Sequence, residues 1–454
     1  MLIGRNSELN QLGTYYDREN SQILVLYGEP YIGKTKLLQE FMQDKPGFYY
    51  LACPASEREQ KYRLGMRLAN LGIKTLKYPT YSECLSALSA KHSQKKVLVI
   101  DEFQNIIKTS PEFINELVSF IHNSRNSQDY LVILSSSSVA YVENILVSKI
   151  GEAAYELSGF LKMKELSFKD LREYFPLYTN EECAYVWALL GGFPGLWKMF
   201  DSKLSLKQNI ISKIIARDGV LHDVAIKLVE SELRETGVYN TILSALSDGK
   251  NKLNDLYEHT GFSRAKISVY LKNLMELELV KKVFSVDTKG RDYVQKGIYD
   301  IKNHFVDFYF SFMYKYASDL ELMSAEEFYA NHIQGSLKSF VGKYYVDICR
   351  EYLMQQNSKG RLPINAVDFG KWVGKPGTID IVATDEADNA VLALCVFDKP
   401  MITYDDFEWL QFCARKAELP TDSIYLFSAG RFDEKLTLEG KISQRLHLVL
   451  LDRM

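Results

Sequence analysis

Residues 28–35, GEPYIGKT, have the types and spacing that phosphate chemistry requires. A glycine, four residues and Gly-Lys-Thr form the pattern of a phosphate-binding P-loop. Gly28 and Gly33 allow backbone conformations that a side chain would block. Lys34 can reach the β- and γ-phosphates of a nucleotide, and the Thr35 hydroxyl can ligate Mg²⁺. This stretch therefore predicts a site for a nucleoside triphosphate and Mg²⁺.

The flanking residues predict the strand and the helix that must position this loop. The apolar run Gln22–Tyr27 comes before it and is typical of a buried strand. After it, Leu37, Leu38, Phe41 and Met42 recur at the spacing of one helix face. Loop N–H groups and the positive end of the helix would then converge on the anionic phosphates.

Two carboxylates end the apolar strand predicted over residues 95–100. Asp101 can hold Mg²⁺ through water, because Mg²⁺ keeps most of its hydration shell. Glu102 can orient and deprotonate an attacking water. An isolated acidic pair would more simply end a strand, but downstream of a P-loop the pair predicts a metal-supporting acid and a general base.

Strands alternate with helices in this part of the chain, with helix expected over residues 55–92. The alternation predicts a parallel sheet with ligands at the carboxyl ends of its strands. One more strand, Tyr130–Leu134, ends in the serine run Ser135–Ser138. A hydroxyl there could sense the γ-phosphate or the attacking water, and turn-forming serines at a strand end are an equally weighted alternative.

The composition is that of an ordinary globular protein. The chain has 454 residues, 46% hydrophobic and 25% charged, which predicts about three domains. A net charge of −3 supplies no global attraction to nucleic acid or membrane, so any such contact must be local. Six cysteines without a CxxC pair argue against a zinc site or a disulfide framework. No signal peptide or long apolar run is recognisable, which predicts a cytoplasmic protein with no membrane contact.

The first 200 residues resemble the signal-transduction branch of the AAA-type ATPases. The resemblance rests on Arg5 in the segment IGRNSEL, the P-loop, the pair 101–102, the polar strand end, and a Gly-Gly-x-Pro element that contains Pro194. It implies that Arg5 lies near the nucleotide, that Pro194 lies where a helical lid meets it, and that Ser137 is the sensor. More narrowly, the chain is similar to archaeal and bacterial ATPases that carry a winged helix and then a restriction-endonuclease-like region.

Two departures from the family pattern concern catalysis. Many relatives have basic residues where this chain has Pro30 and Tyr31, and an arginine pair where it has Leu157–Phe160. An arginine that reaches the γ-phosphate is worth roughly 10³–10⁵ in rate. We therefore expect slow hydrolysis unless a partner supplies an arginine.

Three helices and two short strands after Val238 predict a winged helix. Its third helix, Arg264–Leu277, can enter a DNA major groove. Residues 236–300 contain ten Lys/Arg and eight Asp/Glu, far from the basic stripe of a dedicated DNA-binding domain. A winged helix used for protein packing is therefore an equally weighted alternative. The side chains left for phosphates or bases are Arg264, Lys266, Lys272 and Asn273.

The last part of the chain resembles the PD-(D/E)XK nuclease core in its order of helix and strands. Such a site needs carboxylates for Mg²⁺ and a lysine to activate water. Asp380 stands where the first acid belongs, but Leu394–Val396 replaces Glu-x-Lys and Val346 replaces the helix acid. We expect a vestigial nuclease, which Asp398 and Lys399 would rescue only if the register is off by a few residues.

The expected fold is α/β, with a P-loop NTPase parallel sheet and helical lid, then a winged helix, then an α/β restriction-endonuclease-like domain. The expected function is an ATP-binding, slowly hydrolysing switch that uses Mg²⁺ and couples nucleotide state to the later domains. One alternative is a module that binds double-stranded DNA or a protein around a structural nucleotide, and a less favoured one is an ATP-gated nuclease. The sequence does not distinguish ATP from GTP or indicate the oligomeric state. The expected domains are 1–165 (ATPase core), 166–236 (lid), 237–320 (winged helix and aromatic helix) and 321–454 (nuclease-like).

Overall fold

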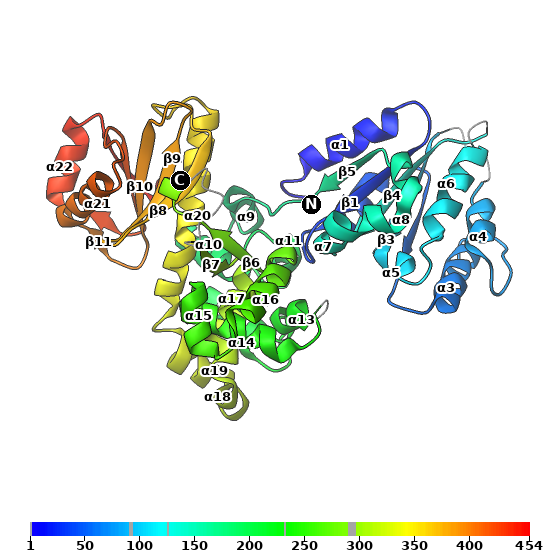
Figure 1. Cartoon of the computed structure of the whole chain (residues 1–454), viewed down its shortest axis with the longest axis horizontal. Helices are drawn as coiled ribbons and strands as arrows, with labels where there is room; N and C mark the ends of the chain where they lie inside the picture. Colours follow the sequence, from blue (N-terminus) through cyan, green and yellow to red (C-terminus); the bar gives the residue numbers. More distant parts are fainter. Residues whose placement is uncertain (1, 90–93, 125–126, 231–232, 289–296) are drawn as a thin grey trace. The chain divides into compact units, whose positions relative to one another are not determined.

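The computed structural model describes residues 2–89, 94–124, 127–230, 233–288 and 297–454. The chain folds into two compact units (Figure 1). The first contains Met1–Leu166 and Phe193–Gly195, and the second contains Ser167–Gly192 and Leu196–Met454. The chain therefore passes between the units at three points. None of the described helices combines the length and apolar character that a membrane crossing requires.

A five-stranded parallel sheet forms the centre of the first unit. Its strand order is β2-β3-β4-β1-β5, and every neighbouring pair is parallel. Strands β1, β4 and β3 are adjacent and run in the same direction, so their carboxyl ends meet at one end of the sheet. The P-loop, the two acids and the serine run therefore lie together at that end. The α/β class and the parallel sheet are thus confirmed. The strands are β1 (Gln22–Tyr27), β2 (Gly47–Leu51), β3 (Lys96–Asp101), β4 (Tyr130–Ser136) and β5 (Gly159–Lys162).

Helices cover this sheet and bury the alternating side chains of its strands. Helices α3, α4 and α6 share one apolar core with one set of strand residues, including Val25 of β1 and Ile100 of β3. The helical structure predicted over residues 55–92 is confirmed only in part, because α3 ends at Ala69 and α4 begins at Tyr81; residues 90–92 lie outside the described ranges. The helical segments are α1 (Asn6–Asp17), α2 (Lys34–Met42), α3 (Glu57–Ala69), α4 (Tyr81–Ala87), α5 (Gln104–Ile107), α6 (Phe113–Ser124), α7 (Val139–Tyr141), the π-helix η1 (Val142–Leu146), α8 (Val147–Ile150) and the 3₁₀ helix η2 (Gly151–Glu156).

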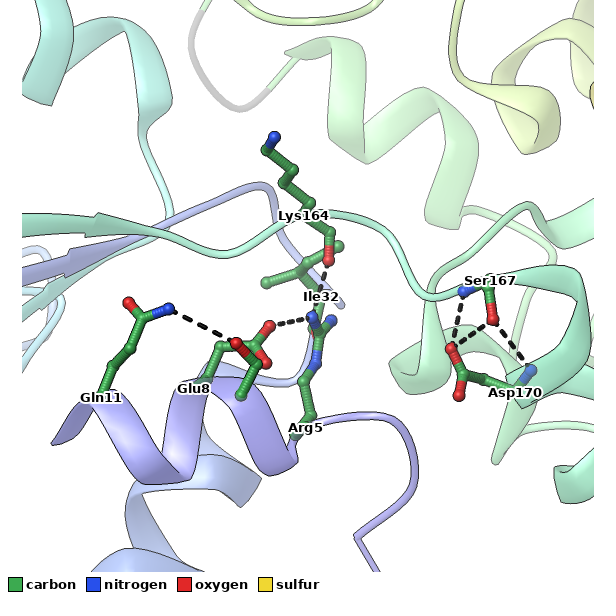
Figure 2. A network of polar contacts seen from close by, with 8 residues as sticks. Arg5, Glu8, Gln11, Ile32, Lys164, Ser167 and Asp170 are labelled. Carbon is green, nitrogen blue, oxygen red and sulfur yellow. Dashed lines mark hydrogen bonds and ion pairs between the residues drawn. The ribbon is translucent and has the colours of Figure 1, made fainter. Parts of the chain in front are cut away.

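The second unit begins with a helical segment. Reciprocal hydrogen bonds between Ser167 and Asp170 cap the first of these helices (Figure 2). The Glu351 carboxylate also accepts from the Phe168 N–H at 2.7 Å, which ties this helix start to the later part of the unit. The segments are α9 (Phe168–Tyr174), α10 (Asn180–Leu190), α11 (Pro194–Trp197, whose first two residues belong to the first unit), α12 (Leu206–Asn209), the π-helix η3 (Ile210–Ile215) and α13 (Val224–Glu230).

Three helices and an antiparallel strand pair follow, in the order that the winged-helix prediction requires. Ile267, Leu271 and Leu274 are buried on the inner face of the third helix. These elements are α14 (Thr236–Ser247), α15 (Leu253–Thr260), α16 (Arg264–Glu276), β6 (Val280–Val283), the 3₁₀ helix η4 (Val286–Thr288) and β7 (Ile298–Ile301). The aromatic segment and the turns after it form α17 (His304–Phe308), η5 (Tyr309–Tyr314), α18 (Ala317–Leu322), α19 (Ala325–Phe328) and η6 (Tyr329–Ile333).

A second sheet, with strand order β14-β12-β10-β9-β8, completes the second unit. Strands β10, β12 and β14 are parallel, whereas β8 and β9 are antiparallel to their neighbours. The 22-residue helix α20 contacts β9 and β10 (Figure 1). The elements are α20 (Leu337–Ser358), β8 (Asp368–Val373), β9 (Thr378–Thr384), β10 (Ala390–Val396), β11 (Met401–Ile402), α21 (Tyr404–Lys416), β12 (Ile424–Ser428), β13 (Arg431–Phe432), α22 (Glu434–Ile442), β14 (Leu446–Leu450) and the 3₁₀ helix η7 (Leu451–Arg453).

The segment after β6 packs against the outer strand of this second sheet. The Ser285 hydroxyl accepts a hydrogen bond from the Val373 N–H at 2.9 Å. A side chain on Gly370 would place its Cβ 2.5 Å from the Val286 side chain, so only glycine leaves room for this contact. The winged-helix region therefore packs closely against β8.

Candidate nucleotide-binding site

The P-loop joins β1 to α2, and two of its residues have a left-handed backbone conformation. Gly33 has φ +99° and Tyr31 has φ +64°, and the value at Tyr31 is uncommon for a residue with a side chain. A Cβ on Gly28 would lie 2.8 Å from the Met163 carbonyl oxygen, so glycine is required there for space. The first N–H groups of α2 have no acceptor within the helix and suit an anionic ligand.

The Lys34 ammonium lies over the loop. It donates to the Gly28 carbonyl at 2.8 Å and to the Glu29 carbonyl at 3.1 Å, and the side chain is buried. Burial lowers the Lys34 pKa, while the nearby Glu102, Asp101 and Glu29 oppose that shift. A phosphate could replace these neutral acceptors with charged ones, which form stronger hydrogen bonds.

Asp101 is buried and its carboxylate accepts three hydrogen bonds. The Thr35 hydroxyl donates to Oδ2 at 3.0 Å, the Tyr49 hydroxyl donates to Oδ2 at 2.6 Å, and the Glu102 N–H donates to Oδ1 at 3.1 Å. Because the Thr35 hydroxyl donates its hydrogen bond to Asp101, the lone pairs of the Thr35 oxygen remain available for a cation. These oxygens are ligands that suit Mg²⁺. The sequence did not indicate Tyr49.

Glu102 and Ser137, the predicted base and sensor, lie in direct contact. Glu102 Oε2 accepts from the Ser137 hydroxyl at 2.6 Å and from the Ser137 N–H at 3.2 Å. Gln104, which the sequence also did not indicate, donates to the same oxygen at 2.6 Å. Glu102 has φ +56°, a left-handed conformation that costs energy and persists only where the surrounding structure imposes it. Three donors therefore converge on one oxygen of the Glu102 carboxylate.

Arg5 lies beside the P-loop and is almost fully buried (Figure 2). Its Nη1 donates to Glu8 Oε1 at 2.7 Å and to the Lys164 carbonyl at 2.8 Å, and its Nη2 donates to the Ile32 carbonyl at 2.8 Å. Arg5 also occupies the N-cap position of α1 and makes no side-chain capping hydrogen bond there. Arg5 thus joins the P-loop to the segment that leads out of the first unit.

Phe193–Gly195 returns to the first unit and packs on the same loop. The Gly195 N–H donates to the Tyr31 carbonyl at 2.8 Å. A Cβ on Gly33 would lie 3.4 Å from the Pro194 ring, and a Cβ on Gly195 would lie 2.7 Å from the Tyr31 carbonyl oxygen. Pro194 therefore contacts the P-loop; a direct contact with nucleotide stays a prediction.

Three of the residues predicted to contact DNA, Arg264, Lys266 and Lys272, are exposed on α16, and Asn273 is partly buried. The Arg264 guanidinium lies 4.0 Å from the centre of the Tyr257 ring. Lys266 lies 4.8 Å from the centre of the Phe262 ring. Lys272 has Glu276 at 3.8 Å, an exposed pair that adds little to stability. Asn273 is less available, because its amide donates to the Tyr239 hydroxyl at 2.7 Å.

Asp380, the predicted vestigial nuclease acid, is a partly buried carboxylate on β9. It accepts from the Cys395 N–H at 2.8 Å, and burial raises its pKa to about 6. Lys399 pairs instead with Asp406 at 2.9 Å. Within the described ranges, no three His, Cys, Asp or Glu side chains are grouped so that they could hold a metal ion. The loss of nuclease chemistry stays a prediction.

Comparison with known proteins divides the chain into three regions. Residues 2–200 match an ATPase domain found predominantly in Archaea. Residues 240–282 match bacterial regulatory proteins of the arsR family, and residues 309–399 match archaeal and bacterial proteins of unknown function. The chain is therefore similar to an ATPase domain, which supports nucleotide binding, and then to an arsR-type winged helix. None of these matches names a nuclease, so the nuclease-like fold also stays a prediction.

Two relatives and one solved structure are similar over much of the chain. An uncharacterized Methanocaldococcus jannaschii protein, MJECL04, is 28% identical over 398 residues, which are 86% of each chain. An uncharacterized ATP-binding protein of the same organism, MJECL26, is 25% identical over 61% of this chain and 89% of its own. The Walker-type ATPase PABY2304 of Pyrococcus abyssi is similar in fold, with a TM-score of 0.51, 16% identity, and coverage of 68% of this chain and 96% of that one.

Proposed function

We propose that the first unit binds ATP with Mg²⁺ and works as a slowly hydrolysing molecular switch. The observation that carries the proposal is the 3.0 Å hydrogen bond between Thr35 and Asp101. It joins the P-loop to the acid at the end of a different strand, as a shared Mg²⁺ site requires. Magnesium would neutralise phosphate charge there.

Each residue of the site has a separate part in this proposal. Lys34 and the loop N–H groups bind phosphate, while Thr35 and Asp101 hold the metal. Glu102 takes a proton from the attacking water once Ser137 turns its hydroxyl toward the γ-phosphate. That movement removes a donor from Glu102 Oε2 and leaves a lone pair of that oxygen free to accept the proton of the water. No arginine takes part in this scheme, so the basal rate is low.

Two main-chain carbonyls of the P-loop connect the nucleotide site to the rest of the chain. The Ile32 carbonyl shares Arg5 with the Lys164 carbonyl, and the Tyr31 carbonyl accepts from the Gly195 N–H. Lys164 and Gly195 each lie within two residues of a point where the chain passes to the second unit. A change in loop conformation would therefore act directly on both connections.

Thermal unfolding with and without ATP·Mg²⁺ tests the switch. A ligand at 100 times its Kd adds about 2.7 kcal/mol of stability. We expect this shift in the wild type and its loss in Lys34→Ala, with Lys36→Ala as the control. Lys36 lies two residues away and is exposed, where it pairs with Glu40 at 3.4 Å. No shift in the wild type, or an equal shift in Lys34→Ala, would refute nucleotide binding at this loop.

DNA binding by the winged helix is a second proposed activity, supported by the match of residues 240–282 to arsR-type regulators. Arg264 and Lys266 are exposed at the start of α16, the helix that would approach the major groove. Affinity for duplex DNA should fall as salt rises, and the double change Arg264→Ala with Lys266→Ala should abolish it. Binding that is independent of salt and of these residues would favour the protein-packing alternative.

A further inference from the structure

Tyr49 extends from the neighbouring strand β2 into the proposed metal site. In the parallel register, Tyr49 lies opposite Val99 and Leu51 lies opposite Asp101. Residues two apart on a strand face the same side of the sheet, so the Tyr49 side chain runs along that face toward Asp101. Its hydroxyl donates to Asp101 Oδ2 at 2.6 Å, shorter than the 3.0 Å bond from Thr35 to the same atom.

The three donors leave little freedom to the Asp101 carboxylate. An ionised carboxylate offers about four lone-pair positions. Thr35 and Tyr49 occupy Oδ2, and the Glu102 N–H occupies one position on Oδ1. One position therefore remains for a water in the shell of Mg²⁺. Tyr49 and Thr35 approach from different elements, β2 and α2, and together they prevent rotation of the carboxylate.

We propose that Tyr49 is a positioning residue that sets the Mg²⁺ affinity of the nucleotide site. This inference rests on the proposed function. Tyr49 acts through Asp101, because it holds the one remaining lone pair of the carboxylate in the direction of the cation's water shell. Partners of this kind in metal sites typically contribute about 10- to 100-fold to metal affinity.

The backbone of Tyr49 is held in place, since the Tyr49 carbonyl accepts from Arg67 Nε at 3.0 Å. A fixed backbone supports a positioning role for the side chain.

The variant Tyr49→Phe removes the hydroxyl and keeps the ring. The assay follows binding of a fluorescent ATP analogue while Mg²⁺ is titrated, and repeats the binding measurement in EDTA. We expect the half-saturating Mg²⁺ concentration to rise about tenfold or more, with the affinity in EDTA changed by less than about twofold. A merely structural role would weaken binding in both conditions.

Tyr50→Phe is the matched control, one residue further along the same strand. The Tyr50 hydroxyl is buried in the core and donates to Gln60 Oε1 at 2.8 Å, with no bond to Asp101 among the described contacts. Its half-saturating Mg²⁺ concentration should equal that of the wild type. If Tyr49→Phe also keeps the wild-type Mg²⁺ dependence, or binds Mg²⁺ more tightly, the inference is overturned while nucleotide binding stands. If the wild type binds no nucleotide, both proposals fail together.

Discussion

Replacing Arg5 with alanine tests whether the P-loop depends on the contacts in Figure 2. Arg5 is 3% exposed and its partner Glu8 is 14% exposed, with 2.7 Å between their nearest charged atoms. Removing one partner of a buried ion pair typically costs about 3–5 kcal/mol, because the other charge is left uncompensated. The Ile32 and Lys164 carbonyls would also lose their donor. We therefore expect Arg5→Ala to destabilise the first unit by about 3–5 kcal/mol.

The assay must report on the first unit alone. All four tryptophans, Trp187, Trp197, Trp372 and Trp409, lie in the second unit, so tryptophan fluorescence would miss the effect. Hydrogen exchange of β1 and β4 in increasing urea measures the opening of the first sheet directly.

An exposed arginine provides the matched control for this experiment. Arg63 also has a carboxylate at 2.7 Å, from Glu59, but these side chains are 49% and 44% exposed. An exposed pair of this kind contributes little, so Arg63→Ala should leave the exchange of β1 and β4 nearly unchanged. Equal losses in Arg5→Ala and Arg63→Ala would refute the view that Arg5 holds the loop.

Three further predictions concern Glu102, the segment Phe193–Gly195 and Asp380. Glu102→Gln should keep nucleotide affinity and lower phosphate release by about 10²–10⁴-fold, measured against the wild type at equal ATP occupancy. Gly195→Ala should speed hydrogen exchange around Tyr31, because its Cβ would lie 2.7 Å from the Tyr31 carbonyl oxygen, whereas Gly13→Ala should not, because its Cβ meets no atom within 4 Å. Burial raises the Asp380 pKa from 3.8 to about 6, so the folded state favours the protonated acid and stability should fall as pH rises through this range. Asp380→Asn should remove that fall in urea unfolding followed by tryptophan fluorescence; a fall of the same size in this variant would contradict the assignment.

The parts of the site that lie at strand ends could be predicted from the sequence. Asp101, Glu102 and Ser137 each follow an apolar run, and parallel strands bring such positions to one edge. Tyr49 could not be found in this way, because its role depends on β2 lying beside β3, and local patterns do not define strand order. Likewise, the helix expected over residues 55–92 contains a non-helical stretch that periodicity did not reveal.

The close fit of Val286 against Gly370 has a consequence for how this protein can be dissected. Strand β8 is one of the two edge strands of the second sheet, and an uncovered edge strand is a template for pairing with other chains. Ser285 and Val286 shield part of it. A fragment cut between the winged helix and α20 would expose this strand and be prone to aggregate, so soluble fragments should retain residues 233–454 together.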